Sequence, residues 1–441
     1  MKCEKGNELY RKAKKLIPGG TQLLSKRPEM FLPEQWPSYY TRAKGVEIWD
    51  IDDNRYIDVG STGIGTCILG YADPDVDAAV KKAVDAGNLT TLNCPEEIEL
   101  VELLCDIHKW AEMGRFTRSG GESLVVAIRI ARAATGKDKI AFCGYHGWHD
   151  WYLSANLASG SNLDAQLLPG LEPAGVPRGL SQTILPFNYN KPEELQAIID
   201  QHGSELATIV MEPVRNVEPQ PGFLEKVREL ADKSKAVLIF DEVTSGWRMT
   251  LGGCHLLYGV KPDMAVFAKG LSNGYPMGAV IGKRSIMDCA QKSFISSTYW
   301  TDKIGPTAAL ATIRKMQKNN VAKHIGVIAD QVRTGWAKIA KSHDLPVKIM
   351  GRPQLSVLSY DIHDGDQVQA LATLYVQEML DRGYLAAKTF YPTYSHNEKI
   401  AQDYLKTCDE VFALMAKAHK ENSVLKMLRG PVAMSGFKRL N

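Results

Sequence analysis

Apolar and polar residues alternate at residues 45–58, on both sides of the turn-forming residues 52–54. Alternation with a period of two is typical of strands with one buried face, so this segment is predicted to form a β-hairpin. Farther along the chain, apolar residues recur with helical spacing and predict helices over residues 98–107 and 123–134.

Short, continuous apolar runs come before and after the predicted helices. Runs of this length favour buried strands, and helices that alternate with such strands imply a mainly parallel sheet. The runs lie at residues 139–143, 207–211, 236–240 and 264–268.

The pattern changes beyond about Lys318 to longer helical stretches with strand-like pieces, such as residues 355–361, and a last helix over 397–418. A chain of 441 residues is also too long for a single core. We therefore expect an α/β protein with a large domain and a smaller α+β domain. The expected large domain is 60–318, and the small one combines 1–59 and 319–441.

Composition and charge narrow the function. Of all residues, 44% are hydrophobic and 23% charged, and the net charge of +3 comes from interspersed side chains, which argues against nucleic acid or an anionic membrane as a partner. The eight cysteines show no metal-cluster spacing, no apolar run reaches membrane-spanning length, and residues 1–15 resemble a first helix more than a signal peptide. We expect a cytoplasmic protein that acts on small molecules and binds no metal.

Two predicted strands end in residues that can carry chemistry. VLIFDEV places Asp241 at the end of one strand, and AVFAKG places Lys269 at the end of another. A desolvated lysine can form imines with carbonyls, and a nearby anion can keep a pyridine nitrogen protonated. Taken singly, a strand-end lysine is usually a surface residue and a strand-end aspartate a turn former, so the pair needs a phosphate site and a ring clamp beside it.

Two further segments supply these parts. RSGGES, at 118–123, places small residues before a helix expected to begin near Glu122, where free amides favour an anion. GYHGWHD, at 144–150, offers aromatic side chains on which a ring could stack. The alternatives are a simple helix cap and an aromatic loop packed on the core.

With these motifs the chain resembles the class III aminotransferases of pyridoxal 5'-phosphate (PLP) fold type I, especially the branch that contains glutamate-1-semialdehyde aminomutase. The likeness extends to LIPGG, ILGYADPDVDAAVKKAV, AIRIARAATGKDKI, MEPV, DEVTSGWR and AKGLSNGYPMGAVIG. It implies PLP as cofactor, with pyridoxamine 5'-phosphate in the half-reaction, and a large domain built on a mainly parallel, seven-stranded sheet flanked by helices. It also implies a homodimer whose subunits share the active site.

The resemblance implies roles for residues at matching positions. Lys269 would form the Schiff base with PLP and shuttle the proton between the two carbons of the imine. Asp241 would pair with the pyridine nitrogen, while Val243 and Tyr145 would pack on opposite faces of the ring. Glu212 would lie near the ring hydroxyl or the substrate.

The phosphate would be bound by Ser119, Gly120 and Gly121 and by a threonine of the partner subunit. Counting along the chain selects Thr301 for that threonine, with Thr298 close enough to compete. The family's usual Ser-Gly-Thr-Glu loop reads SGGE here, so a threonine hydroxyl is missing and the backbone amides must do more.

The resemblance predicts a ping-pong reaction between an amino acid, glutamate being the expected donor with 2-oxoglutarate as its product, and an aldehyde or keto acceptor. The segment FISSTYWTDKIGP resembles those of aminotransferases for sugar aldehydes and keto sugars. It suggests an acceptor such as 8-oxo-3,8-dideoxy-octulosonate, in amino sugar and lipopolysaccharide biosynthesis. Candidate substrate contacts are Lys26, Arg27, the tract around residues 394–396, and His146. Taken singly, Lys26, Arg27 and that tract are more often ordinary surface groups.

Other functions remain as alternatives. Glutamate-1-semialdehyde 2,1-aminomutase would use the same residues. A serine hydrolase would use Ser272 in GLSNG, but Tyr275 and Pro276 follow at once and oppose the helix that a nucleophile elbow requires. A non-catalytic binding protein on this fold would be expected to lack the lysine or the aspartate. His146 and His149 could bind a metal only if their segment were helical.

Overall fold

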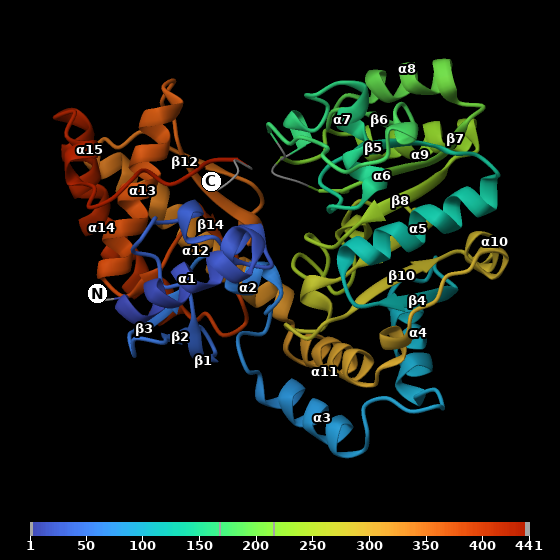
Figure 1. Ribbon diagram of the computed structural model, residues 1–441, viewed down its shortest axis with the longest axis horizontal. Coiled ribbons are helices and arrows are strands. Elements are labelled where there is room, and N and C mark those ends of the chain that lie inside the picture. Colours follow the sequence, from blue (N-terminus) through green and yellow to red (C-terminus); the bar gives the residue numbers. More distant parts are fainter. Residues whose placement is uncertain (1–2, 167–168, 215–216, 437–441) are drawn as a thin grey trace. The chain divides into compact units, whose positions relative to one another are not determined.

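The computed structural model describes residues 3–166, 169–214 and 217–436 (Figure 1). The chain forms two compact units. Pro74–Ala322 make up one, which we call the middle unit, and Met1–Asp73 with Lys323–Asn441 make up the other, the terminal unit. The boundaries expected from the sequence, at residues 60 and 318, come somewhat earlier in the chain.

The middle unit contains a seven-stranded sheet in the order β4-β10-β9-β8-β7-β5-β6. Strand β10 is antiparallel to both of its neighbours, and the remaining pairs are parallel, so the predicted mainly parallel sheet is confirmed. The strands are β4 (Met113–Thr117), β5 (Lys139–Cys143), β6 (Ile184–Pro186), β7 (Leu206–Met211), β8 (Val237–Asp241), β9 (Met264–Phe267) and β10 (Gly278–Gly282).

The four apolar runs predicted as strands are β5, β7, β8 and β9. Every residue of β7, β8 and β9 is buried, as continuous apolar runs in a parallel sheet require. Strand β10 was not expected. It is antiparallel because residues 268–277, which connect it to β9, are too few for the crossover of about a dozen residues that parallel strands need.

Helices pack on this sheet. α5 (Gly120–Thr135) lies against β7, β9 and β10, while α8 (Pro192–His202) and α9 (Phe223–Ser234) share a core with β7 and β8 (Figure 1). The other helices of this unit are α3 (Pro74–Asp85), α4 (Pro95–Ile107), α6 (Asp150–Leu153), α7 (Ala155–Ala158), α10 (Arg284–Met287) and α11 (Ile304–Asn319).

The terminal unit contains two smaller sheets, in the orders β1-β2-β3-β13 and β11-β12-β14. The predicted hairpin is confirmed as β2 and β3, and Asp50 Oδ1 fixes its turn by accepting the amides of Asp52, at 2.9 Å, and Asn54, at 2.8 Å. The strands are β1 (Tyr40–Lys44), β2 (Glu47–Asp50), β3 (Arg55–Asp58), β11 (Val347–Met350), β12 (Ser356–Tyr360), β13 (Tyr384–Leu385) and β14 (Thr389–Phe390).

The core of the terminal unit is rich in aromatic side chains, including Trp336, Tyr375, Phe390 and Tyr404, contributed by both its helices and its strands. Its helices are α1 (Glu4–Leu16), α2 (Thr62–Gly65), α12 (Val321–His343), α13 (Gly365–Asp381), α14 (Glu398–Lys420) and α15 (Val424–Met427), so the predicted first and last helices are both confirmed. None of the helices among the described residues is long and apolar enough to cross a bilayer.

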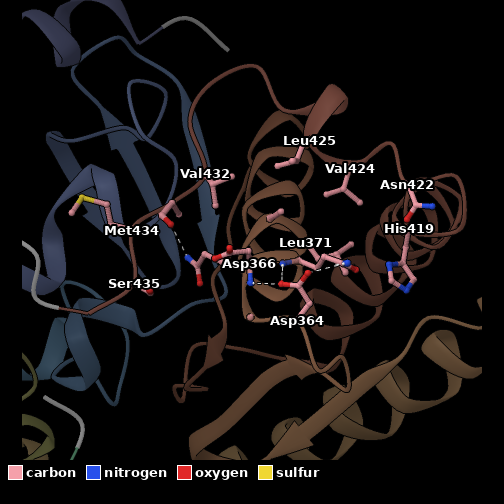
Figure 2. A pocket seen from close by; sticks show the side chains of 15 residues that line it. Asp364, Asp366, Leu371, His419, Asn422, Val424, Leu425, Val432, Met434 and Ser435 are labelled. Atoms are coloured by element: carbon pink, nitrogen blue, oxygen red, sulfur yellow. Dashed lines mark hydrogen bonds between the residues drawn. The ribbon is translucent and has the colours of Figure 1, made fainter. Parts of the chain in front are cut away.

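The terminal unit also has an open pocket of about 900 Å³ at the start of α13 (Figure 2). Asp364 caps the helix there, accepting the amides of Asp366 and Gln367, and Gln369 Nε2 donates to the Ala433 carbonyl at 3.0 Å. Because Asp364 caps the helix and Gln369 tethers the segment around Ala433, we interpret the pocket as a structural groove. It contains none of the residues predicted to bind the cofactor.

Candidate active site

Asp241 and Lys269 lie at the same edge of the sheet. Asp241 is the last residue of β8 and is only 3% exposed. Lys269 follows the adjacent parallel strand β9 by two residues, and the register pairs Asp241 with Val266. The structure therefore brings together the carboxylate and the amine that the sequence placed at strand ends, as expected where parallel strands deliver their carboxyl ends.

The backbone and the amine of Lys269 are both held in place. Its φ of 45° is in the left-handed region, which a non-glycine residue adopts only at a conformational cost. Its Nζ donates to Thr244 Oγ1 at 2.8 Å. Burial lowers the pKa of this amine, and the Arg248 guanidinium lowers it further, whereas Glu212 and Asp241 act in the opposite direction. The lowered pKa increases the share of neutral, nucleophilic amine.

Both carboxylate oxygens of Asp241 accept hydrogen bonds. Oδ2 lies 2.8 Å from His146 Nδ1, and Oδ1 accepts the Val243 amide at 3.0 Å. His146 is fully buried, and its Nε2 faces the Cys143 carbonyl at 3.2 Å. From the sequence, His146 was a candidate substrate contact. In the structure its ring is buried against Asp241. Sequence alone does not show whether a loop histidine points inward or outward.

The amino end of α5 forms a narrow cradle. The helix begins at Gly120, slightly before the start expected near Glu122, and Ser119 is its N-cap. Ser119 Oγ accepts the Glu122 amide at 3.4 Å and donates to Glu122 Oε2 at 3.1 Å. A Cβ on Gly120 would lie 2.9 Å from Val243 Cγ1, so only glycine lets these amides approach the loop after β8 so closely. First-turn amides have no acceptor within a helix and are suited to an anion.

The aromatic loop after β5 contacts the end of β7. The Tyr145 amide donates to Glu212 Oε2 at 3.1 Å, and Glu212 follows β7 directly. Gly144 has a φ of 123°, and a Cβ there would lie 2.6 Å from the same oxygen. Burial raises the pKa of Tyr145, with contributions from Asp241 and Glu212, which places its ring within electrostatic reach of both carboxylates.

Thr298 and Thr301 lie at the two ends of one exposed 3₁₀ turn. Thr301 Oγ1 donates to the Thr298 carbonyl at 2.9 Å. Arg118, beside the α5 cradle, holds this turn by donating to the Trp300 carbonyl at 2.8 Å and pairing with Asp302. Both hydroxyls therefore remain at the surface of the middle unit.

Lys26, Arg27 and Ser272 are further predicted residues. Lys26 and Arg27 belong to the terminal unit, where Lys26 ends a 3₁₀ turn and the Arg27 amide donates to the Leu24 carbonyl. Ser272 is fully buried and donates its hydroxyl to the Tyr275 carbonyl at 2.6 Å. Since that hydroxyl is engaged with a backbone oxygen and is followed by no helix, the geometry contradicts the serine hydrolase alternative.

The comparison with known families decides the assignment. The family model described as Aminotransferase class-III matches residues 33–391. The chain belongs to the class III aminotransferases. The resemblance stated from its motifs is thereby confirmed, together with its cofactor class: the protein is a PLP-dependent transaminase.

Individual relatives of this class III aminotransferase carry different names. It is similar to the 3-aminobutyryl-CoA aminotransferase of Cloacimonas acidaminovorans (strain Evry), with 31% identity over 388 residues, 86% of this chain and 89% of that protein. It is also similar to the glutamate-1-semialdehyde 2,1-aminomutase of Syntrophus aciditrophicus (strain SB), with 34% identity over 427 residues, 91% and 96% of the two chains. A solved structure of a transaminase with PLP bound matches with a TM-score of 0.84 and 25% identity, covering 95% of this chain and 100% of that one.

The residues at this edge of the aminotransferase's sheet fit PLP. The α5 cradle offers amides to a phosphate where added Cβ atoms would close the space. Asp241 offers a buried carboxylate whose oxygens can each accept a further hydrogen bond. Sequence reasoning gave no role to Thr244 or Arg248 and considered His149 only as a metal ligand, because the positions of these side chains depend on loops rather than on strand ends.

Glu242, next to Asp241 in the aminotransferase, belongs to a separate buried network. Its Oε1 accepts from the amide and the Nδ1 of His255 at 2.9 and 2.8 Å, and its Oε2 accepts from Ser245 Oγ at 2.5 Å. Trp110 Nε1 in turn donates to His255 Nε2 at 2.9 Å. This network links Glu242, at the end of β8, to His255, which follows the 241–248 loop, and to Trp110, just before β4. It therefore stabilises the segment next to Asp241.

We predict that Glu242→Gln flattens the acid dependence of stability. Burial alone would raise the Glu242 pKa, but the donors from His255 and Ser245 outweigh it and lower the pKa from 4.5 to about 2. A depressed carboxylate pKa stabilises the fold above the unfolded value, and this contribution of about 3 kcal/mol is lost as the pH falls from 4.5 toward 2. Urea unfolding across that window measures it. Glu229→Gln, on the exposed side of α9, serves as control, and an equal slope in both variants would contradict the assignment.

Proposed function

We propose that this aminotransferase moves an amino group from an amino acid such as glutamate to an aldehyde or ketone, with Lys269 as the residue that holds PLP and transfers protons. The observation that carries the proposal is the juxtaposition of the Lys269 amine, whose pKa is lowered, and the buried Asp241 carboxylate at the ends of adjacent strands. An amine without a proton can both bind a carbonyl and accept a proton from carbon.

When bound, PLP takes up the amino group and accepts the electron pair released at the substrate carbon. Lys269 Nζ would act as the base that moves the proton. Asp241 would supply fixed negative charge for a protonated ring nitrogen, and the α5 amides would bind the phosphate. Val243 and Tyr145 would pack on the two faces of the ring, and Glu212 would lie near the ring hydroxyl or the substrate.

His146 acts in this proposal as a positioning residue. Its two ring nitrogens lie within hydrogen-bonding distance of Asp241 Oδ2, at 2.8 Å, and of the Cys143 carbonyl, at 3.2 Å. Held between these two groups, His146 fixes the orientation of the Asp241 carboxylate. This role replaces the substrate contact expected from the sequence.

The acceptor that we propose is a sugar carbonyl, such as 8-oxo-3,8-dideoxy-octulosonate, and thus a step of lipopolysaccharide synthesis. Support comes from residues 294–306, in which Tyr299 is 73% exposed and available to pack on a sugar ring. Lys26 and Arg27 are the proposed contacts for substrate carboxylates, since lysine and arginine bind such groups well.

Glutamate-1-semialdehyde 2,1-aminomutase is the second candidate. It is favoured by the similarity to the Syntrophus aciditrophicus aminomutase, which extends over 96% of that protein. The two functions share all their residues and differ in whether the amino group leaves the substrate.

A panel of acceptors tests the choice. Purified protein is incubated with glutamate and, in turn, the 8-oxo sugar acid, simple aldehydes and keto acids, with 2-oxoglutarate release as the measurement. 3-Aminobutyryl-CoA is tested separately as a donor with 2-oxoglutarate as acceptor, with glutamate formation as the measurement, because a relative is named for it. Release only with the sugar acid supports the proposed acceptor. Rearrangement of glutamate-1-semialdehyde without any donor overturns it in favour of the aminomutase.

We also propose a homodimer in which Thr301, or Thr298, reaches the partner's phosphate site. Support comes from large apolar side chains that the middle unit exposes at its surface and that a partner subunit could cover. They include Leu92 at 81%, Ile98 at 67% and Phe294 at 90% exposed.

Mixing two inactive chains tests the shared site. Lys269→Ala and Thr301→Val homodimers are each expected to be impaired, but hybrids formed after unfolding and refolding together would carry one intact site. Recovery of about a quarter of the wild-type activity is expected if the subunits assort at random. Recovery with Thr298→Val in place of Thr301→Val would select the other threonine, and no recovery with either would contradict a shared site.

A further inference from the structure

The space beside the second residue of α5 is filled by a histidine. Gly121 stands where the family's loop carries threonine, and a Cβ at Gly121 would lie 2.9 Å from His149 Cε1 and 3.0 Å from His149 Nδ1. Side-chain carbons do not approach other atoms that closely. The imidazole of His149 therefore occupies the place of the missing threonine side chain.

The Nδ1 of the His149 ring is buried and has no hydrogen-bond partner among the residues that the structure describes. A buried polar atom without a partner is costly and is usually explained by a ligand, an ion or water. Burial lowers the pKa of His149, while Glu122 and Asp150 raise it, and even the neutral ring has one N–H to donate.

The ring of His149 is held where it is. Its carbonyl caps α6, accepting the amides of Tyr152 and Leu153 at 2.9 and 3.1 Å. The Trp148 ring stacks on it with a centroid separation of 4.4 Å and an interplanar angle of 23°. A fixed donor loses little entropy when a ligand binds.

Residues 119–121, at the start of α5, offer no free side-chain donor. Gly120 and Gly121 have no side chains, and the single hydroxyl hydrogen of Ser119 is donated to Glu122 Oε2. Ser119 thus has only its backbone to offer a phosphate. His149 supplies the missing kind of group at the place where the threonine hydroxyl would be.

We propose that His149 binds the phosphate of PLP and replaces the threonine that this chain lacks. The proposal rests on the proposed binding of PLP at the amino end of α5. The His149 imidazole is then a cofactor ligand that comes from the loop after β5 rather than from α5. Gly121 leaves the space for this ring, so Gly121 and His149 together replace the threonine.

Binding of PLP and of pyridoxal, which lacks the phosphate, tests this. Both affinities are measured by titrating full-length protein freed of cofactor, and the ³¹P resonance of the PLP-bound protein is recorded. His149→Ala is expected to weaken PLP about tenfold to a hundredfold and to leave pyridoxal unchanged, as for a lost charge-assisted hydrogen bond. An unchanged ratio of the two affinities would overturn the proposal.

Restoring the threonine gives a second, independent readout. Gly121→Thr alone is expected to weaken PLP binding because its Cβ collides with His149. In the His149→Ala background the same change is expected to strengthen PLP binding, because the collision is gone and the hydroxyl is available. Gly121→Thr must therefore weaken PLP binding in the wild-type protein and strengthen it in His149→Ala. An equal loss of PLP affinity in both proteins would refute the proposal that His149 replaces the threonine.

Two controls separate this proposal from the proposed function. His363→Ala removes an exposed histidine of the terminal unit and is expected to leave both affinities unchanged. Gly120→Val fills the cradle, with its Cβ against Val243 rather than His149, and should weaken PLP more than pyridoxal. If Gly120→Val weakens PLP binding and His149→Ala does not, the phosphate site at α5 is supported and the proposed role of His149 is wrong. If neither does, the phosphate binds elsewhere.

Discussion

Replacing Lys269 with alanine is expected to abolish the yellow, borohydride-sensitive absorbance of the protein and to lower the rate of amino transfer at least about a thousandfold, since general acid–base catalysis alone contributes about 10²- to 10⁴-fold. The amine is buried near Asp241 and hydrogen-bonded to Thr244, so no solvent molecule takes its place with the same geometry. Absorbance spectra and single-turnover rates with glutamate measure both effects.

The variant also allows a positive test. A small primary amine in the buffer should restore part of the single-turnover rate of Lys269→Ala, because it can reach the vacated space and accept the proton. Lys261→Ala, an exposed lysine just before β9, is the matched control and should behave as wild type. Wild-type turnover by Lys269→Ala would exclude the whole proposed mechanism.

Asp241→Asn is expected to lower kcat by about 10²-fold or more, because the asparagine keeps the shape but removes the charge that favours a protonated ring nitrogen. PLP should still bind, since the phosphate contacts at α5 are unchanged. Stopped-flow measurement of the first half-reaction, with PLP affinity measured in parallel, separates the two effects.

A buried carboxylate at the opposite end of the same strands provides the comparison. Asp263, just before β9, accepts from Arg228 at 2.9 Å and from Lys283 at 2.7 Å. Asp263→Asn should reduce stability, as breaking a buried pair does, but leave kcat intact. Equal losses of kcat in the two variants would show that Asp241 matters only for the fold.

The sequence predicted the strand ends well. Continuous apolar runs identify buried strands, and the charged residue that ends such a run lies at the ligand-binding edge whatever the surrounding loops do. Asp241 and Lys269 were placed in this way without knowledge of the register. Strand β10 escaped this reasoning because a short run containing two glycines, Gly278–Gly282, looks like a loop until its antiparallel neighbours are known.

The direction of loop side chains could not be predicted. His146 and His149 are three residues apart in one loop, yet one ring is buried against Asp241 and the other packs on Gly121. Nothing in residue type or spacing distinguishes them. One signal was available: a glycine where the family has threonine leaves a space, and a nearby side chain must fill it.

The order of the chain has a consequence for how the protein is made. The middle unit is one uninterrupted segment, so a ribosome delivers all its strands before the last part of the polypeptide emerges. By contrast, β3 can pair with its parallel neighbour β13 only after the chain has been synthesised past Tyr384, which pairs with Ile57. Domains generally fold as units during synthesis. The middle unit can therefore fold while the amino-terminal strands of the terminal unit still lack their carboxy-terminal partner.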